Sequence, residues 1–279
     1  MNHDPVFTHF RPSEVVADGV SVYDFLGVKT DTRFKKAWVQ FAAPAGKAVQ
    51  ARLPAFNEHY PDWVLTLESV LRASGTYRVA ELGAGWGTWS SIAAAAARTR
   101  PQISGVEVVA LEADPTHHKW LQQHFAVNGL KADGVHLVHG AISKERGQAR
   151  FPVIENPDED YGASLRQVNN GGDFIVVDSF ILEDVISKFT GAVDFMHVDI
   201  QGAEYDVIPD NMDLLKRSVK SIMIGTHISL QHHEGMRDRF LERGWRERMN
   251  YPRMALCDTP YGKIQFGDGV LGFENPDLF

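Results

Sequence analysis

Cysteine is almost absent from this sequence of 279 residues, because Cys257 is the only one. A lone cysteine excludes an intrachain disulfide and a cysteine-based zinc cluster. Long apolar runs are missing as well, and the longest, from Ile92 to Ala97, is far too short to span a bilayer. The first residues lack the basic and apolar segments of a signal peptide. We therefore expect a cytoplasmic protein with no membrane partner.

Runs of Lys and Arg are also missing, and the formal net charge is −8. Binding to a phosphate backbone depends mainly on cationic side chains, so we expect no nucleic-acid partner. Hydrophobic residues make up 44% and charged residues 23% of the chain, as in ordinary soluble globular proteins. These bounds favour an enzyme or binding protein that acts on a small molecule. They leave the oligomeric state open, a homodimer included.

From Arg78 onward, short β-branched segments alternate with helical ones, which predicts a parallel sheet covered by helices on both faces. The fold class is therefore α/β. The predicted strands are 78–82, 106–111, 135–138, 193–199 and 221–226. The predicted helices are 57–74, 88–98, 114–127, 181–189, one that starts at 203, and 230–243. The tail segments 245–250 and 263–273 predict a closing antiparallel pair.

Two segments depart from this alternation. Residues 1–57 lack the rhythm, and we predict that they form a small N-terminal arm or cap on a main domain of residues 58–279. Residues 143–173 contain an acidic loop and the turn Asn169–Gly172, which predict a hairpin-like insertion over one edge of the sheet. Within it, Tyr161–Ser164 is expected to act as a lid, since long loops over strand tips often carry specificity.

A glycine-rich loop follows the first predicted strand, where open parallel sheets bind their ligands. Its G-x-G-x-G spacing differs from the G-x-G-x-x-G fingerprint of dinucleotide-binding proteins. Glu81, two residues before the first glycine, suits a cationic amino-acid moiety better than a diphosphate. The alternative is a tight strand-to-helix turn without a ligand. The cofactor-contacting residues predicted here are Glu81, Gly83, Ala84, Gly85, Trp86 and Gly87.

The second predicted strand ends in Glu112 and Ala113. A carboxylate at this strand tip can accept two hydrogen bonds from a ribose diol, in NAD and in adenosyl cofactors alike. Without the glycine loop, Glu112 would be interpreted as a surface acid. With the loop, we predict that Glu112 binds ribose and that Ala113 lies beside it.

The sequence resembles the FkbM-type methyltransferases, a branch of the class I S-adenosylmethionine-dependent enzymes, over residues 56–276. The resemblance rests on the segments 79–87, 177–181, 194–204 and 224–227. It implies a Rossmann-like sheet of seven strands with the last antiparallel, and methyl transfer to an oxygen of a sugar or natural product. It also implies that Gly140 and Ala141 line the adenine pocket. Many members have Lys and Glu where this chain has His197 and Gln201.

Three polar residues end the fourth and fifth predicted strands. His197 and Asp199 are two residues apart and so share one face of a strand, and His227 follows the adjacent strand. We predict that His227 is the general base for an alcohol acceptor, as a neutral imidazole, with Asp199 orienting the substrate or cofactor and His197 in support. The same three residues have the ligand types of a two-histidine, one-carboxylate metal site, so a divalent metal remains an alternative.

The sequence thus favours an S-adenosylmethionine-dependent O-methyltransferase acting on a small hydroxylated molecule. A nicotinamide-dependent oxidoreductase is the first alternative, disfavoured by the glycine spacing and the early acid. A non-catalytic module that binds an adenosyl ligand is the second, because His197 and Gln201 replace the usual residues of the resemblance. Binding of S-adenosylmethionine or of NADH separates the first two, and turnover separates the third.

Overall fold

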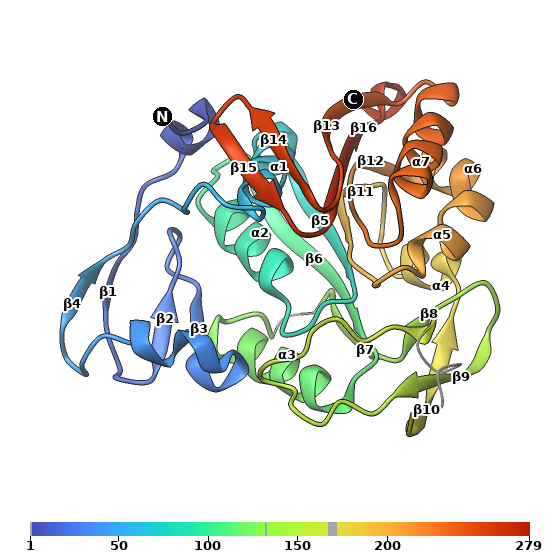
Figure 1. The fold of residues 1–279 in the computed structure, drawn as a ribbon. Coiled ribbons are helices and arrows are strands. Elements are labelled where there is room, and N and C mark those ends of the chain that lie inside the picture. The colour runs from blue at the N-terminus through green and yellow to red at the C-terminus, as the bar shows by residue number, and fades with distance from the viewer. Residues whose placement is uncertain (1, 132, 167–171) are drawn as a thin grey trace.

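A computed structural model describes residues 2–131, 133–166 and 172–279. Its centre is a seven-stranded sheet, drawn in the middle of Figure 1. The strands lie in the order β13 (Arg246–Tyr251), β16 (Gly269–Glu274), β12 (Val219–Thr226), β11 (Val193–Val198), β5 (Gly75–Leu82), β6 (Ile103–Glu112) and β7 (Val135–His139). Strand β16 is antiparallel to both of its neighbours, whereas the strands from β12 to β7 are parallel. The predicted Rossmann-like class I methyltransferase sheet is confirmed.

Helices cover both faces of the sheet (Figure 1). One face packs against α1 (Tyr60–Arg72), α2 (Thr88–Arg98) and α3 (Pro115–Val127). The other packs against α4 (Leu182–Ile186), α5 (Glu204–Val207), α6 (Met212–Ser218) and α7 (Leu230–Glu242). Alternate residues of one strand enter opposite cores, as Val79 and Ala80 of β5 do. The sheet therefore lies between two hydrophobic cores, which hold its strands in place.

Local signals explain where the helices begin. Asp114 caps α3, because its carboxylate accepts the backbone N–H of Thr116 and of His117, each at 2.8 Å, and Pro115 occupies the first helical position. The helix α2 starts directly after the glycine loop and contains an unbroken run of alanine from Ala93 to Ala97, the best helix former. The predicted start of α2 at residue 88 is confirmed, and α3 starts at Pro115 with Asp114 as its cap.

The insertion differs from its predicted bounds. Strand β9 (Gly147–Pro152) pairs antiparallel with β10 (Phe174–Phe180), which also lies parallel to the short β8 (Ala141–Ile142). The hairpin-like form is observed, but its second strand lies beyond residue 173 and belongs to a separate three-stranded sheet. The predicted turn Asn169–Gly172 lies almost wholly outside the described residues.

The predicted pairing of 263–273 was partly wrong. Strand β16 does pair with β13, but residues Gly262–Phe266 form β15, which pairs with β14 (Ala255–Thr259) in a hairpin of its own. Asp268 lies between β15 and β16, so the segment changes sheets there. The physical reason is that the pattern of 263–273 fits one long strand or two short ones equally well.

Residues 1–57 contain short elements only. The strands β1 (Glu14–Val16) and β4 (Ala48–Gln50) pair with each other, as do β2 (Ser21–Tyr23) and β3 (Lys29–Asp31). The 3-10 helices with described bounds are η1 (Pro5–His9), η2 (Thr32–Phe34), η3 (Lys36–Phe41), η5 (Pro209–Asn211) and η6 (Pro276–Leu278). In the described part of the chain, no helix has the length and apolar character needed to cross a bilayer.

Candidate functional site

The glycine loop turns sharply between β5 and α2. Gly83 has φ 75°, and a Cβ on it would lie 1.8 Å from the carbonyl oxygen of Asp199. Gly85 has φ 55°, and a Cβ there would meet only the ring of Tyr161, at 3.7 Å. Gly83 is therefore required by the close approach of another backbone segment. The space above Gly85 is the part of the loop that a ligand can approach.

Glu81 is occupied by the start of α2. Its carboxylate accepts the backbone N–H of Trp89 at 3.1 Å and that of Ser90 at 2.8 Å, and it also accepts the Ser90 hydroxyl. Burial raises the pKa of Glu81, while the charge of His197 opposes that rise. Glu81 lines the cavity but first serves as a cap that satisfies the free N–H groups of the helix. The sequence did not indicate this second task.

Glu112 connects the tip of β6 to the glycine loop. One carboxylate oxygen accepts the backbone N–H of Gly85 at 2.7 Å, and the other accepts that of Asp114 at 2.8 Å. Burial raises the pKa of Glu112 to about 7 against these hydrogen bonds. Each oxygen of a carboxylate has two lone pairs, so both oxygens keep one for a ribose hydroxyl.

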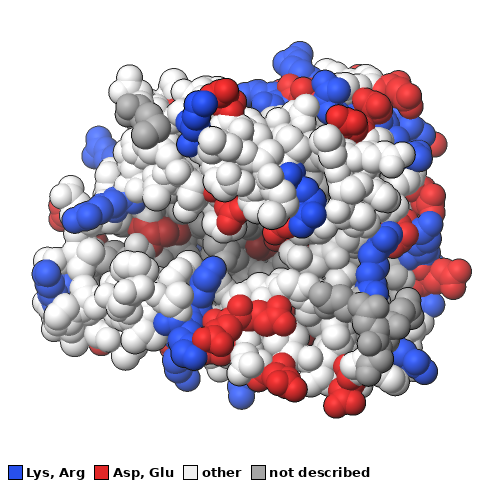
Figure 2. Space-filling model, in the orientation of Figure 1, with Lys and Arg blue, Asp and Glu red and all other residues white. Residues whose placement is uncertain are grey.

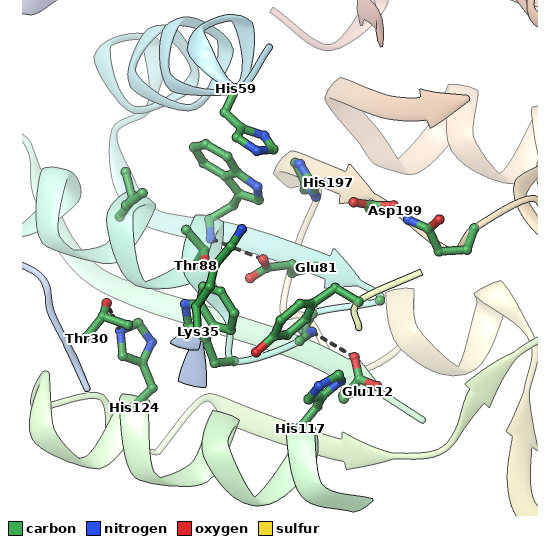
Figure 3. A pocket seen from close by; sticks show the side chains of 18 of the residues that line it. Thr30, Lys35, His59, Glu81, Thr88, Glu112, His117, His124, His197 and Asp199 are labelled. Carbon is green, nitrogen blue, oxygen red and sulfur yellow. Dashed lines mark hydrogen bonds between the residues drawn. The ribbon is translucent and has the colours of Figure 1, made fainter. Parts of the chain in front are cut away.

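A cavity of about 730 Å³ opens at this edge of the sheet. Figure 2 shows the hollow across the middle of this face, with carboxylates inside it and Lys and Arg side chains near its margin. Figure 3 shows side chains of the arm, the glycine loop and the strand tips converging on it. The predicted site residues that line it are Glu81, Gly83, Ala84, Gly85, Trp86, Glu112, Ala113, Ala141, His197 and Asp199.

Three predicted site residues do not line the cavity: Gly87, Gly140 and His227. A Cβ on Gly87 would lie 2.4 Å from the Leu121 side chain, so this glycine serves the packing of α3. A Cβ on Gly140 would lie 2.5 Å from the carbonyl oxygen of Asp178, so Gly140 serves the approach of β10. The adenine-pocket prediction therefore rests on Ala141 alone.

His227 lies between two carboxylates. Its Nδ1 is 3.0 Å from Glu204, which is fully buried, and its Nε2 is 3.1 Å from Asp199. Burial opposes the charge on the ring, but the hydrogen bonds to Asp199 and Glu204 raise the pKa of His227 to about 10. At neutral pH the ring is therefore protonated, with both nitrogens occupied. The role of His227 as a neutral base stays a prediction, and a ring with both nitrogens on carboxylates gives it no support.

Asp199 remains at the cavity wall. It follows the last residue of β11, its backbone N–H donates to Leu82 at 2.9 Å, and its side chain is 41% exposed. Gln201 donates to the same carboxylate at 2.6 Å. Burial favours the neutral carboxyl, but His227 holds the pKa of Asp199 below its ordinary value. Asp199 is thus an ionised carboxylate facing the cavity, as an orienting role requires.

His197 pairs with a residue that the sequence analysis missed. Its Nε2 lies 2.9 Å from the carboxylate of Asp62, in the first turn of α1, and both side chains are buried. Its Nδ1 has no hydrogen-bond partner in the described chain. The ring stacks on Trp89 at 5.5 Å between centroids and reaches the cavity wall (Figure 3). One nitrogen is therefore fixed by a carboxylate while the other remains unused.

The metal alternative required His197, Asp199 and His227 to be ligands of one metal ion. His197 instead binds Asp62, and His227 binds Glu204 as well as Asp199. Across residues 2–131, 133–166 and 172–279, no group of three or more His, Cys, Asp or Glu side chains has the arrangement of a metal site. The described residues give the metal alternative no support.

Comparison with known proteins decides the family. Residues 76–251 match the sequence model described as the methyltransferase FkbM domain. The chain belongs to the FkbM methyltransferase family. A protein of Jannaschia sp. (strain CCS1), named provisionally as a methyltransferase, is 32% identical over 228 residues, which are 78% of this chain and 79% of that protein. The resemblance inferred from the motifs is therefore confirmed, and the chain is an S-adenosylmethionine-dependent methyltransferase.

A solved FkbM structure shows the same fold. The methyltransferase FkbM of Methylobacillus flagellatus KT aligns with a TM-score of 0.50 and 11% identity, over 76% of this chain and 47% of that one. At this identity the likeness speaks for the fold alone. The family membership leaves the nicotinamide-dependent alternative without support.

The cavity suits the cofactor that this FkbM family uses. The small residue Gly85 leaves backbone open to a ligand, and Glu112 offers lone pairs for a ribose diol. The ionised carboxylate of Asp199 suits a positively charged group. These residues would hold S-adenosylmethionine at the carboxyl ends of β5, β6 and β11.

Asp62 and the N-terminal arm were the main omissions of the sequence analysis. An acid in the first turn of a helix is interpreted as a partner of the helix dipole, so Asp62 carried no catalytic signal. The arm contributes Lys35 and Trp38 to the cavity wall, and His59, directly before α1, contributes as well. Its irregular sequence indicated a cap but gave no register by which to place a side chain.

Proposed function

We propose that this FkbM methyltransferase methylates a hydroxyl oxygen of a small molecule. The observation that carries the proposal is the His197–Asp62 pair at the cavity wall, with Nδ1 of the ring unused. A hydroxyl acceptor must lose its proton as the new bond to carbon forms, and an imidazole with one free nitrogen is a suitable proton acceptor. His227 lacks a free nitrogen, so the proton is assigned to His197.

Asp62 orients the base in this proposal. A carboxylate that binds one imidazole nitrogen fixes the tautomer, so the opposite nitrogen, the buried Nδ1, keeps the lone pair that accepts the proton. Burial alone would lower the pKa of His197, but Asp62, with Glu81 and Asp199, raises it. A raised pKa makes the ring a stronger base and stabilises the imidazolium that proton uptake forms.

A small acceptor is supported by the shape and charge of the site. A cavity of about 730 Å³ is within the range that holds drug-sized ligands. The arm walls it with aromatic rings such as Trp38, and the formal charge of −8 disfavours a polyanionic acceptor. S-adenosylmethionine supplies the methyl group as an electrophile when bound. The protein residues align the acceptor, exclude water and take up its proton.

Methyl-labelled S-adenosylmethionine with a panel of phenols, polyols, amines and thiols tests this function. Label on oxygen, at a rate that His197→Gln lowers about 10²- to 10⁴-fold, is the expected result. Label only on nitrogen, carbon or sulfur would overturn the hydroxyl assignment. Cofactor binding without turnover on any acceptor would favour the non-catalytic module.

The pH profile separates a base from a structural histidine. Because Asp62 raises the pKa of His197, turnover should rise with pH above the ordinary value of 6.5. Asp62→Asn should lower the maximal rate and move this rise to lower pH. An unchanged pH profile in Asp62→Asn would show that the pair has no part in proton transfer.

A further inference from the structure

Three cations follow one another closely in the arm, and only one of them faces the cavity. Arg33 pairs with Asp31 at 2.7 Å, and Lys36 pairs with Glu159 at 2.7 Å. Lys35 has no carboxylate partner among the described residues, lines the cavity, and lies with Nζ 5.6 Å from the centroid of the Trp38 ring. Lys35 is a half-buried residue, and an ammonium group at a cavity wall without a counter-charge indicates a place for an anion.

The arm is fixed against the glycine loop at this point. The Trp86 ring of the loop lies 6.3 Å from Phe34 and 5.5 Å from Trp38, the rings on either side of Lys35 along the chain. The Tyr161 hydroxyl donates to the carbonyl of Phe34 and so ties the insertion to the same place. Figure 3 shows the Lys35 side chain reaching across the cavity toward the start of α2.

The charges around the cavity narrow the choice of anion that Lys35 would bind. Carboxylates of Glu81, Glu112 and Asp199 surround the loop, and these suit cationic groups and a ribose diol. The other Lys or Arg in the wall is Arg52, an exposed residue. The amino-acid part of S-adenosylmethionine carries a carboxylate that the acidic groups would repel. Lys35 is the described cation that is placed beside the loop to receive it.

We propose that Lys35 binds the carboxylate of the cofactor's amino-acid part, so the N-terminal arm completes the cofactor site. This rests on the binding of S-adenosylmethionine in the cavity described above. The arm precedes residues 76–251, the part of the chain that matches the family model. The contribution of Lys35 is therefore a feature of this chain that the family match does not carry.

Calorimetric titration with two ligands tests the proposal without an acceptor. S-adenosylhomocysteine carries the amino-acid carboxylate, whereas methylthioadenosine lacks the whole amino-acid part. Lys35→Met should weaken S-adenosylhomocysteine about 10- to 100-fold, the range for a lost hydrogen bond to a charged group, and leave methylthioadenosine unchanged. Lys36→Met, which removes a neighbouring charge that faces Glu159, should leave both affinities unchanged.

The outcomes are separable. Unchanged binding of S-adenosylhomocysteine by Lys35→Met would overturn the proposal. So would an equal loss for both ligands, because that result points to a displaced arm rather than a missing charge. Wild-type protein that binds neither ligand would instead remove the cofactor site itself, and the role of Lys35 with it. Retained affinity in Lys35→Arg would add support, since arginine keeps the charge.

Discussion

Gly83 offers a direct test of how the glycine loop is built. In Gly83→Ala the new Cβ would meet the carbonyl oxygen of Asp199 at 1.8 Å, and the residue would keep φ near 75°. A left-handed conformation costs a non-glycine residue about 1–2 kcal/mol, and overpacking adds about 1–3 kcal/mol. The sum is a loss of about 2–5 kcal/mol of unfolding free energy. Because Asp199 must move, the affinity for S-adenosylhomocysteine should also fall.

Gly75 provides a matched control. It has φ 69°, close to that of Gly83, but a Cβ there would meet nothing within 4 Å. Gly75→Ala should therefore cost only the conformational part, about 1–2 kcal/mol, and leave ligand affinity unchanged. Urea unfolding followed by circular dichroism, together with ligand calorimetry, measures both quantities. Equal losses of stability in the two variants would refute the argument from close approach.

Two further predictions concern ionised groups. Burial raises the pKa of Glu112 from 4.5 to about 7. The affinity for S-adenosylhomocysteine, measured by calorimetry, should therefore rise as the carboxylate ionises between about pH 6 and 8. Glu112→Gln should abolish this rise. The same shift means that the folded protein loses stability as pH rises from 4.5 through 7, and Glu112→Gln should remove that loss. His227→Ala should destabilise the fold by about 3–5 kcal/mol, because Glu204 loses its partner. The pKa of His227 in the folded protein, about 10, exceeds its ordinary value of 6.5. The loss of unfolding free energy in His227→Ala should therefore be complete below pH 6.5 and should shrink as pH rises toward 10. An equal loss at pH 6 and pH 10 in urea unfolding would contradict the ion-pair account.

Local patterns in the sequence predicted most of the central fold. The β-branched segments that became β5, β6, β11 and β12 alternate with helices, and Asp114 and Pro115 mark the start of α3. The insertion and the tail were less predictable, because strand pairing within 147–180 and 246–274 depends on contacts far apart in sequence. The break at Gly267 and Asp268 shows the difficulty, since only these two residues separate strands of two different sheets.

The candidate site was predictable where its residues are neighbours in sequence. The glycine loop and Glu112 follow from motif and strand position, and the structure places them around one cavity. The roles of the histidines were not predictable, because they depend on distant partners. His197 binds Asp62 across 135 positions, and His227 contacts Glu204, a residue that no local pattern places beside it.

A crystal structure with S-adenosylhomocysteine tests the central claim most directly. The account predicts one molecule in the cavity, with its ribose hydroxyls on Glu112 and its amino-acid part beside Gly85 and the Asp199 carboxylate. It predicts the carboxylate of that part at Lys35. Electron density for the ligand in another place, or a ribose that leaves Glu112 bound only to the glycine loop, would contradict it.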